Sequence, residues 1–78
     1  MDVGIYPNPA TNNEIFVATT TELKTIVLYT INGQMIQKID NPLKVEKGIY
    51  KLSNLPKGFY LVKLSSEEAT ITRKVLVN

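Results

Sequence analysis

Apolar and β-branched side chains of this chain form short runs, separated by Asn, Gly and Pro, in which the dominant period is two. A period of two places alternate side chains on one face of a β-strand, whereas a helix requires a period near 3.6. Val, Ile, Thr and Tyr also favour strands. The pattern predicts about seven strands, over residues 3–6, 14–19, 23–31, 34–39, 44–52, 58–65 and 69–77.

The strongest turn signal is Asn32-Gly33, which lies between two apolar runs. Both residue types adopt positive φ angles readily, as tight β-hairpins require. A loop of two residues and a loop of three residues both fit the sequence. We favour the longer loop, which places Leu28 opposite Ile36.

Two prolines interrupt the N-terminal run. Pro7 and Pro9 each hold φ near −65° and lack a backbone N–H, so two hydrogen-bond donors are missing from residues 6–9. We therefore expect the first strand to end at Pro7, and we expect residues 6–9 to lie outside any central strand.

A C-terminal helix is the main alternative to an all-strand chain. Residues 65–68, Ser-Ser-Glu-Glu, form a capping-box pattern that could begin one. The residues that follow are rich in Thr, Ile and Val, which lose side-chain freedom in a helix. Residues 69–77 are therefore predicted to form a strand.

Short strands without intervening helices predict an all-β fold, either two antiparallel sheets packed face to face or a small barrel. Side-chain parity indicates that Tyr60, Val62 and Leu64 point inward from one strand, and Ile26 and Leu28 from another. Parity does not decide which face of residues 49–52 or of residues 69–77 points inward, because both segments carry apolar side chains on both faces.

The amino-acid composition excludes most kinds of catalytic site. The 78 residues include no Cys and no His, so thiolate and imidazole ligands, cysteine nucleophiles and Ser-His pairs are all excluded. The acidic residues lie mostly at predicted turns or strand ends, and none has the spacing of a calcium loop. We expect a protein that is not an enzyme and that binds no metal and no cofactor.

The charge pattern argues against nucleic acid as a partner. The formal net charge is only +2, and the lysines are scattered along the chain. Residues 57–64 match part of the RNA-recognition octamer, but two of its three stacking aromatic residues are missing. No apolar stretch approaches the roughly 18 residues that a membrane-spanning helix needs, so we expect no membrane insertion.

Four segments occur in an order and spacing typical of a known family. They are Tyr-Pro-Asn-Pro at residues 6–9, an apolar run ending in a Gly turn at residues 26–34, Leu-x-x-Gly-x-Tyr at residues 55–60, and a Lys followed by apolar residues at 74–77. Over essentially its whole length, the chain resembles the type A C-terminal sorting domain of proteins exported by the type IX secretion system of Bacteroidota. One departure is Thr30, where the family often has Asp or Asn.

The resemblance implies an immunoglobulin-like antiparallel β-sandwich, with residues 1–78 forming a single domain at the end of a larger cargo protein. It also implies a targeting function, in which the outer-membrane secretion machinery recognises the domain in the periplasm. A sortase-like peptidase would then remove it, which leaves the cargo at the cell surface or outside the cell. The residues that the resemblance marks for recognition are Tyr6, Pro7, Asn8, Pro9, Gly33, Leu55, Gly58, Tyr60, Arg73, Lys74, Val75, Leu76 and Val77.

Structural roles compete with recognition at several of these positions. Gly33 and Gly58 suit turns that require positive φ, and Tyr60 suits the core. Lys74 suits a receptor contact or a solvated strand equally well. If residues 73–77 lie at a sheet edge, their unpaired backbone groups could add to a strand of the receptor by β-augmentation.

Two other functions fit an all-β sandwich of this size. An accessory carbohydrate- or protein-binding module of an extracellular enzyme would need an exposed aromatic platform, for which Phe16, Tyr29 and Phe59 are the candidates. A structural spacer would have no sorting activity when fused to a foreign protein. A reporter fusion therefore separates the spacer from the sorting domain.

Overall fold

Seven β-strands and no helix make up the computed structural model, which describes all 78 residues. The strands are β1 (Gly4–Thr11), β2 (Glu14–Ala18), β3 (Thr25–Thr30), β4 (Met35–Asp40), β5 (Ile49–Leu52), β6 (Gly58–Ser65) and β7 (Thr70–Val77). The predicted all-β fold of about seven strands is confirmed. No helix is present that could cross a membrane.

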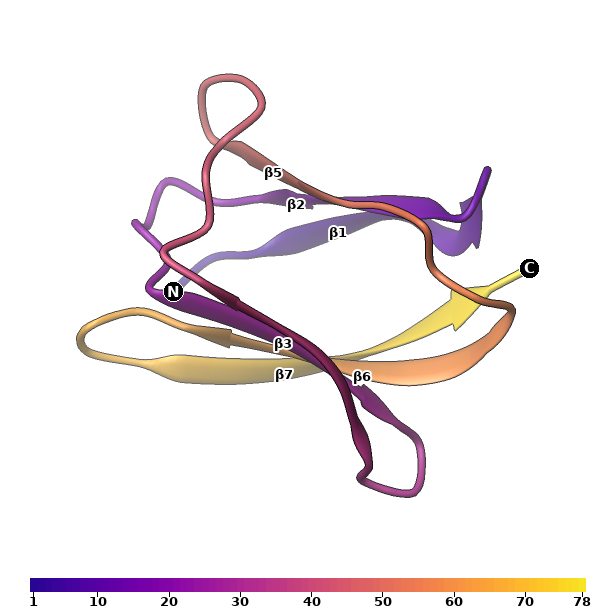
Figure 1. Cartoon of the computed structure of the whole chain (residues 1–78). Helices are drawn as coiled ribbons and strands as arrows, with labels where there is room; N and C mark the ends of the chain where they lie inside the picture. Colours follow the sequence, from indigo (N-terminus) through magenta and orange to yellow (C-terminus); the bar gives the residue numbers. More distant parts are fainter.

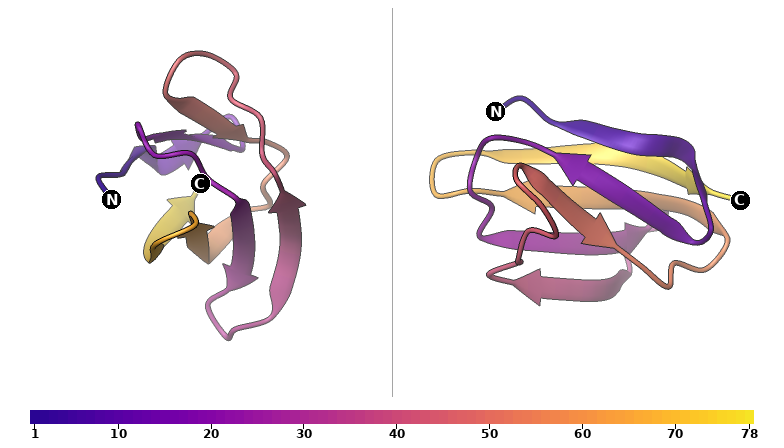
Figure 2. Two further views of the ribbon diagram at one scale, coloured as in Figure 1. Left: turned by 90° about the vertical axis from the view of Figure 1, so that its left-hand side faces the viewer. Right: turned by 90° about the horizontal axis from the view of Figure 1, so that it is seen from above.

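The strands form two facing layers, with β1, β2 and β5 in one layer and β3, β4, β6 and β7 in the other (Figures 1 and 2). Hydrogen bonds link them in the order β4-β3-β6-β7-β1-β2-β5. A single pair, Ala10 with Val77, connects the layers, and β1 and β7 are parallel there. All other strand pairs are antiparallel, as predicted, and this one pair is the exception, since no hairpin joins β1 to β7 and dictates their direction.

The core lies between the layers and follows the predicted parity. Tyr60, Val62 and Leu64 of β6 are buried, as are Ile26 and Leu28 of β3. The structure also assigns the two faces that parity left open, because Tyr50 and Leu52 point inward from β5, and Val75 and Val77 do so from β7. Burying each large apolar side chain contributes roughly 1.5–3 kcal/mol to stability.

The β3–β4 hairpin has the predicted three-residue loop but not the predicted pairing. The N–H of Thr30 donates to the Gln34 carbonyl at 2.8 Å, which closes the loop, and Gly33 has φ of 91°. Tyr29 faces Met35, but Leu28 faces Gln37. The prediction that Leu28 lies opposite Ile36 is wrong, because a β-bulge places one extra residue in β4.

Two strands have an end that differs from the predicted one by more than two residues. The peptide bonds before Pro7 and Pro9 are both cis, and β1 continues past Pro7 to Thr11 instead of ending there. The strand β5 begins at Ile49 and not at residue 44, because residues 44–48 turn back on themselves. In that turn the N–H of Val45 donates to the Ile49 carbonyl at 2.9 Å.

The C-terminal residues form a strand, as predicted, and not a helix. The full length of β7 pairs with β6, from Thr70 beside Ser65 to Val77 beside Gly58. The capping-box segment makes a turn instead, in which the N–H of Ser66 donates to the Ala69 carbonyl at 2.8 Å. Cross-strand pairing is therefore the structure that these β-branched residues adopt.

Candidate recognition site

The N-terminal motif is part of β1, but its proline segment has no backbone partner. Pairing with β2 is recorded at Tyr6 and resumes only at Thr11. Tyr6 is 45% exposed, and its ring stacks on Phe16 with 5.5 Å between centroids. The prediction that residues 6–9 lie outside any central strand is wrong, because β1 runs through them between β7 and β2, and Tyr6 still pairs with Phe16. The missing proline N–H groups instead leave a gap in the pairing with β2 between Tyr6 and Thr11.

Asn8 supplies the contacts that the prolines cannot make. Its side-chain Nδ2 donates to the carbonyl of Lys74 at 3.4 Å, and its Oδ1 accepts from the N–H of Leu76 at 3.1 Å. A side-chain amide carries the same donor and acceptor as a peptide group. Asn8 thus acts as one rung of a ladder between β1 and β7, and it joins the first and last sequence motifs.

The adjacent Ala10 completes this connection. Ala10 is fully buried, pairs with Val77, and accepts a hydrogen bond from the N–H of Asn78 at 3.3 Å. Asn8 and Ala10 together hold the C-terminal half of β7 against β1. Neither contact is visible from local sequence, because the partners lie more than sixty residues apart.

The third motif forms the corner that leads into β6. The Tyr60 hydroxyl donates to the Lys57 carbonyl at 3.3 Å, and the tyrosine is 6% exposed. A tyrosine that bonds back to the chain just before its own strand is a recurrent corner of immunoglobulin-like sandwiches. Gly58 has φ of 143°, and a Cβ there would lie 3.6 Å from the Tyr60 hydroxyl oxygen. Both residues therefore have structural roles in the corner.

Leu55 begins this corner and is held by Asn13, which sequence reasoning did not select. The N–H of Leu55 donates to the Asn13 carbonyl at 2.9 Å, and the Asn13 Nδ2 donates to the Leu55 carbonyl at 2.8 Å. Asn12 and Asn13 form the two-residue turn between β1 and β2, with φ of 56° and 59°. The Asn-Asn pair, which tolerates positive φ, was the signal for this turn.

The matching family model is described as "Secretion system C-terminal sorting domain" and covers residues 4–78. The chain belongs to this family. The curated proteins contain no match to the sequence. The family is that of type IX secretion sorting signals, which direct export to the cell surface or the extracellular space. It is not a catalytic family.

In this sorting domain the C-terminal motif is divided between core and surface. Val75 and Val77 are buried, Leu76 is half-buried, and Arg73 and Lys74 are exposed. The Lys74 ammonium lies 5.1 Å from the centre of the Phe59 ring. The side chains of this segment that a partner could contact are therefore Arg73 and Lys74, with part of Leu76.

The hypothesis of β-augmentation along residues 73–77 does not fit the position of β7. The Lys74 carbonyl and the Leu76 N–H already bond to Asn8, and Ala10 pairs beyond them. A receptor strand could use these groups only after displacing β1. On this side of β7, backbone pairing with β1 is limited to Val77, and the Asn8 side chain bonds to residues 74 and 76.

The remaining motif residues are distributed over the surface of the sorting domain. Gly33 is exposed at the tip of the β3–β4 hairpin, where positive φ explains its presence without a partner. Pro7 is half-buried and Pro9 is exposed. Arg73 borders a surface hollow of about 540 Å³ beside the N-terminal residues Met1 to Gly4.

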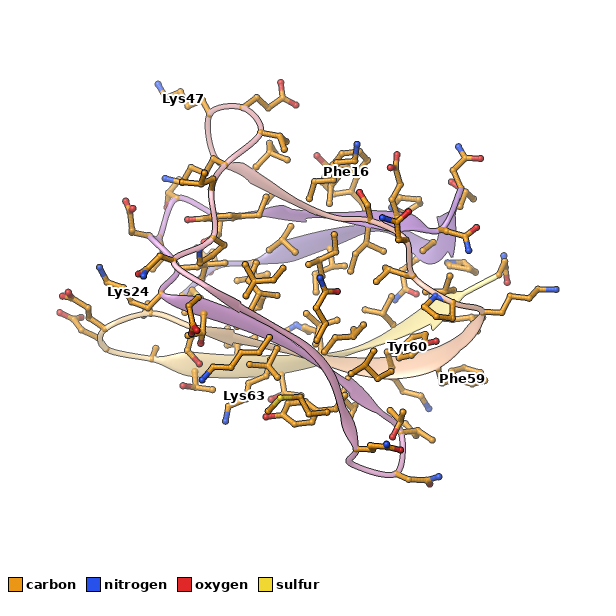
Figure 3. The ribbon with its side chains drawn as sticks, in the orientation of Figure 1. Phe16, Lys24, Lys47, Phe59, Tyr60 and Lys63 are labelled. Atoms are coloured by element: carbon orange, nitrogen blue, oxygen red, sulfur yellow. The ribbon has the colours of Figure 1, made fainter.

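The aromatic platform expected of a carbohydrate-binding module is not assembled. Phe16 lies on the outer side of the β1–β2–β5 layer, whereas Phe59 extends from the opposite layer (Figure 3). Phe59 is 51% exposed, and Phe16 and Tyr29 are half-buried. The three rings therefore do not share one face. The sequence did not predict that Tyr29 pairs with Leu61 and that Phe59 pairs with Leu76.

Proposed function

We propose that this domain directs a cargo protein, attached before its N-terminus, through the periplasm and across the outer membrane by the type IX secretion system. The observation that carries the proposal is the family match over residues 4–78. The contacts of Asn8 with residues 74 and 76 support it, since they make two separate sequence motifs parts of one surface. We further propose that a sortase-like peptidase removes the domain after export by cutting the preceding linker.

The C-terminal motif lies in an ordered strand, which suits recognition by a folded receptor. Two of its side chains, Val75 and Val77, anchor β7 in the core, while Arg73 and Lys74 face solvent. A pre-ordered surface loses less conformational entropy on binding than a flexible tail does. Recognition in this proposal therefore requires the folded sandwich and not the last residues alone.

The test is a fusion of residues 1–78 to the C-terminus of a periplasmic reporter. We expect the reporter to reach the cell surface or medium in a host with a working type IX apparatus and to stay in the periplasm without one. Cleavage is tested in the same strains, because a released reporter should lack the domain when its mass is measured. Export that does not depend on the apparatus would contradict the proposal.

A further inference from the structure

Four apolar side chains lie together on part of the outer face of the layer that contains β3, β6 and β7. The strand register places Tyr29 beside Leu61 and places Phe59 beside Leu76. Phe59 is 51% exposed, and the other three residues are half-buried. We name these four residues the outer apolar face. Exposed apolar clusters on a small domain mark interaction sites more often than isolated apolar residues do.

This face points away from the core. Phe59 and Tyr60 project to opposite sides of β6, with Tyr60 directed toward the other layer and Phe59 directed outward (Figure 3). The apolar surface extends along the same row to Met35 of β4, which pairs with Tyr29 and is 52% exposed. No element of the domain covers it.

Two lysines lie beside the outer apolar face. Lys74 pairs with Leu61 and holds its ammonium 5.1 Å from the Phe59 ring centre, while Lys63 follows Leu61 by two positions on the same side of β6. Neither Lys63 nor Lys74 has a carboxylate within 4.0 Å. The face therefore combines an apolar centre with positive charge that no residue of this chain neutralises.

The opposite layer makes a useful comparison. Its outer side also carries an aromatic pair, Tyr6 on Phe16, and a lysine, Lys51. There, however, the Lys51 ammonium lies 3.3 Å from the Glu14 carboxylate. The charge of Lys51 is therefore balanced within its own layer, whereas the lysines of the outer apolar face lie unpaired beside the exposed ring of Phe59.

We propose that the outer apolar face docks an acidic protein surface with an apolar centre. The proposal rests on the proposed sorting function and specifies the surface chemistry of the partner that binds the domain. Carboxylates on the partner would pair with Lys63 and Lys74, while apolar groups cover Phe59. A second copy of this chain is a poor occupant, since a symmetric contact would place the same lysines against each other.

The arrangement of the face suits a protein partner. A specific interface buries about 800 Å² on each side, which is about one-sixth of the 4819 Å² exposed by this domain. Aromatic residues are enriched at the centres of such interfaces, and charged residues steer association from the rim. The outer apolar face has this arrangement, with its rings central and its lysines beside them.

The first test uses the reporter fusion with two substitutions in this face, Phe59→Ser and Lys63→Glu. Each should lower the exported fraction at least about fivefold, because each removes one part of the contact. The matched controls are Leu43→Ser, at a leucine that is 88% exposed, and Lys47→Glu, at an unpaired lysine on the β4–β5 connection. Both controls should stay within about twofold of wild type, as should Lys63→Arg, which keeps the charge.

Urea unfolding of each purified variant separates misfolding from lost recognition. If Phe59→Ser and Lys63→Glu retain the wild-type unfolding midpoint and are exported as well as wild type, the inference is wrong and the sorting function stands. If the wild-type fusion itself is not exported, the proposed function fails and the inference fails with it. If Lys47→Glu lowers export as much as Lys63→Glu, net charge and not this face is responsible, which also overturns the inference.

The second test identifies the class of partner. A photo-crosslinking residue at position 59 should form an adduct that protease digestion removes, whereas the same residue at position 43 should form none. A protease-resistant glycan adduct at position 59, or no adduct there while the fusion is being exported, would contradict an acidic protein as the occupant.

Discussion

The side-chain oxygen of Asn8 accepts a hydrogen bond from the backbone N–H of Leu76, at 3.1 Å and across 68 positions of the sequence. The prolines on both sides of Asn8 have no N–H to offer a neighbouring strand. The side chain therefore takes over the pairing that the backbone of β1 cannot provide. This explains in physical terms why an asparagine lies between two prolines in the N-terminal motif.

Replacing Asn8 by Ala should loosen the C-terminal half of β7. Both hydrogen bonds are exposed, so we expect a loss of only about 0.5–1.5 kcal/mol in the free energy of unfolding. Amide hydrogen exchange at Leu76 should become faster. The variant Asn8→Asp is the control, since it keeps the acceptor for Leu76 and should preserve protection there. Unchanged exchange at Leu76 in Asn8→Ala would show that the bond does not hold the strand.

The two buried tyrosines should differ in their response to loss of the hydroxyl. Tyr60→Phe removes a donor to the Lys57 carbonyl and should cost about 0.5–1.5 kcal/mol. Tyr50→Phe removes the acceptor for the N–H of Leu23, a buried bond of 3.0 Å, and should cost more, about 1–3 kcal/mol. Urea unfolding measures both. Tyr29→Phe, whose hydroxyl bonds to no group of the protein, should change stability little, and a larger effect there than at Tyr50 would contradict the assignment.

Gly58→Ala should destabilise the domain through its backbone and not through a clash. The φ of 143° is unfavourable for any residue with a Cβ, which predicts a cost of about 1–3 kcal/mol. The nearest atom, the Tyr60 hydroxyl oxygen, would be at an ordinary contact distance of 3.6 Å. Gly4→Ala is the control, because that position has open space and no positive φ. Equal thermal midpoints for the two variants would exclude a backbone effect at Gly58.

Leu64→Ala should leave a cavity between the layers. Leu64 is completely buried in the core cluster, and truncation of such a leucine costs about 2–5 kcal/mol. Leu43→Ala, at a leucine that is 88% exposed, should change the free energy of unfolding by less than about 0.5 kcal/mol. A denaturant titration of the two variants provides the comparison. Similar midpoints would mean that the facing layers do not form the proposed core.

Local sequence was sufficient wherever one strand or turn decided the result. The period of two predicted the inward side chains of β3 and β6, and Asn32-Gly33 predicted the three-residue hairpin loop. The prediction that paired Leu28 with Ile36 was wrong, since a bulge one pair away from the loop shifts the register. A bulge depends on how the strand twists against its neighbours, and no turn residue marks it.

The sequence alone determined that the chain would be built from strands, which side of most strands would be apolar, and that its motifs match a sorting domain, because these properties depend on residue type and spacing. Only the tertiary structure decided that Asn8 would complete the pairing of β7 with β1, and that Phe59 and Tyr29 would meet lysines on one uncovered face. Such relationships join residues from different strands. They follow from register and layer packing, which are properties of the whole fold.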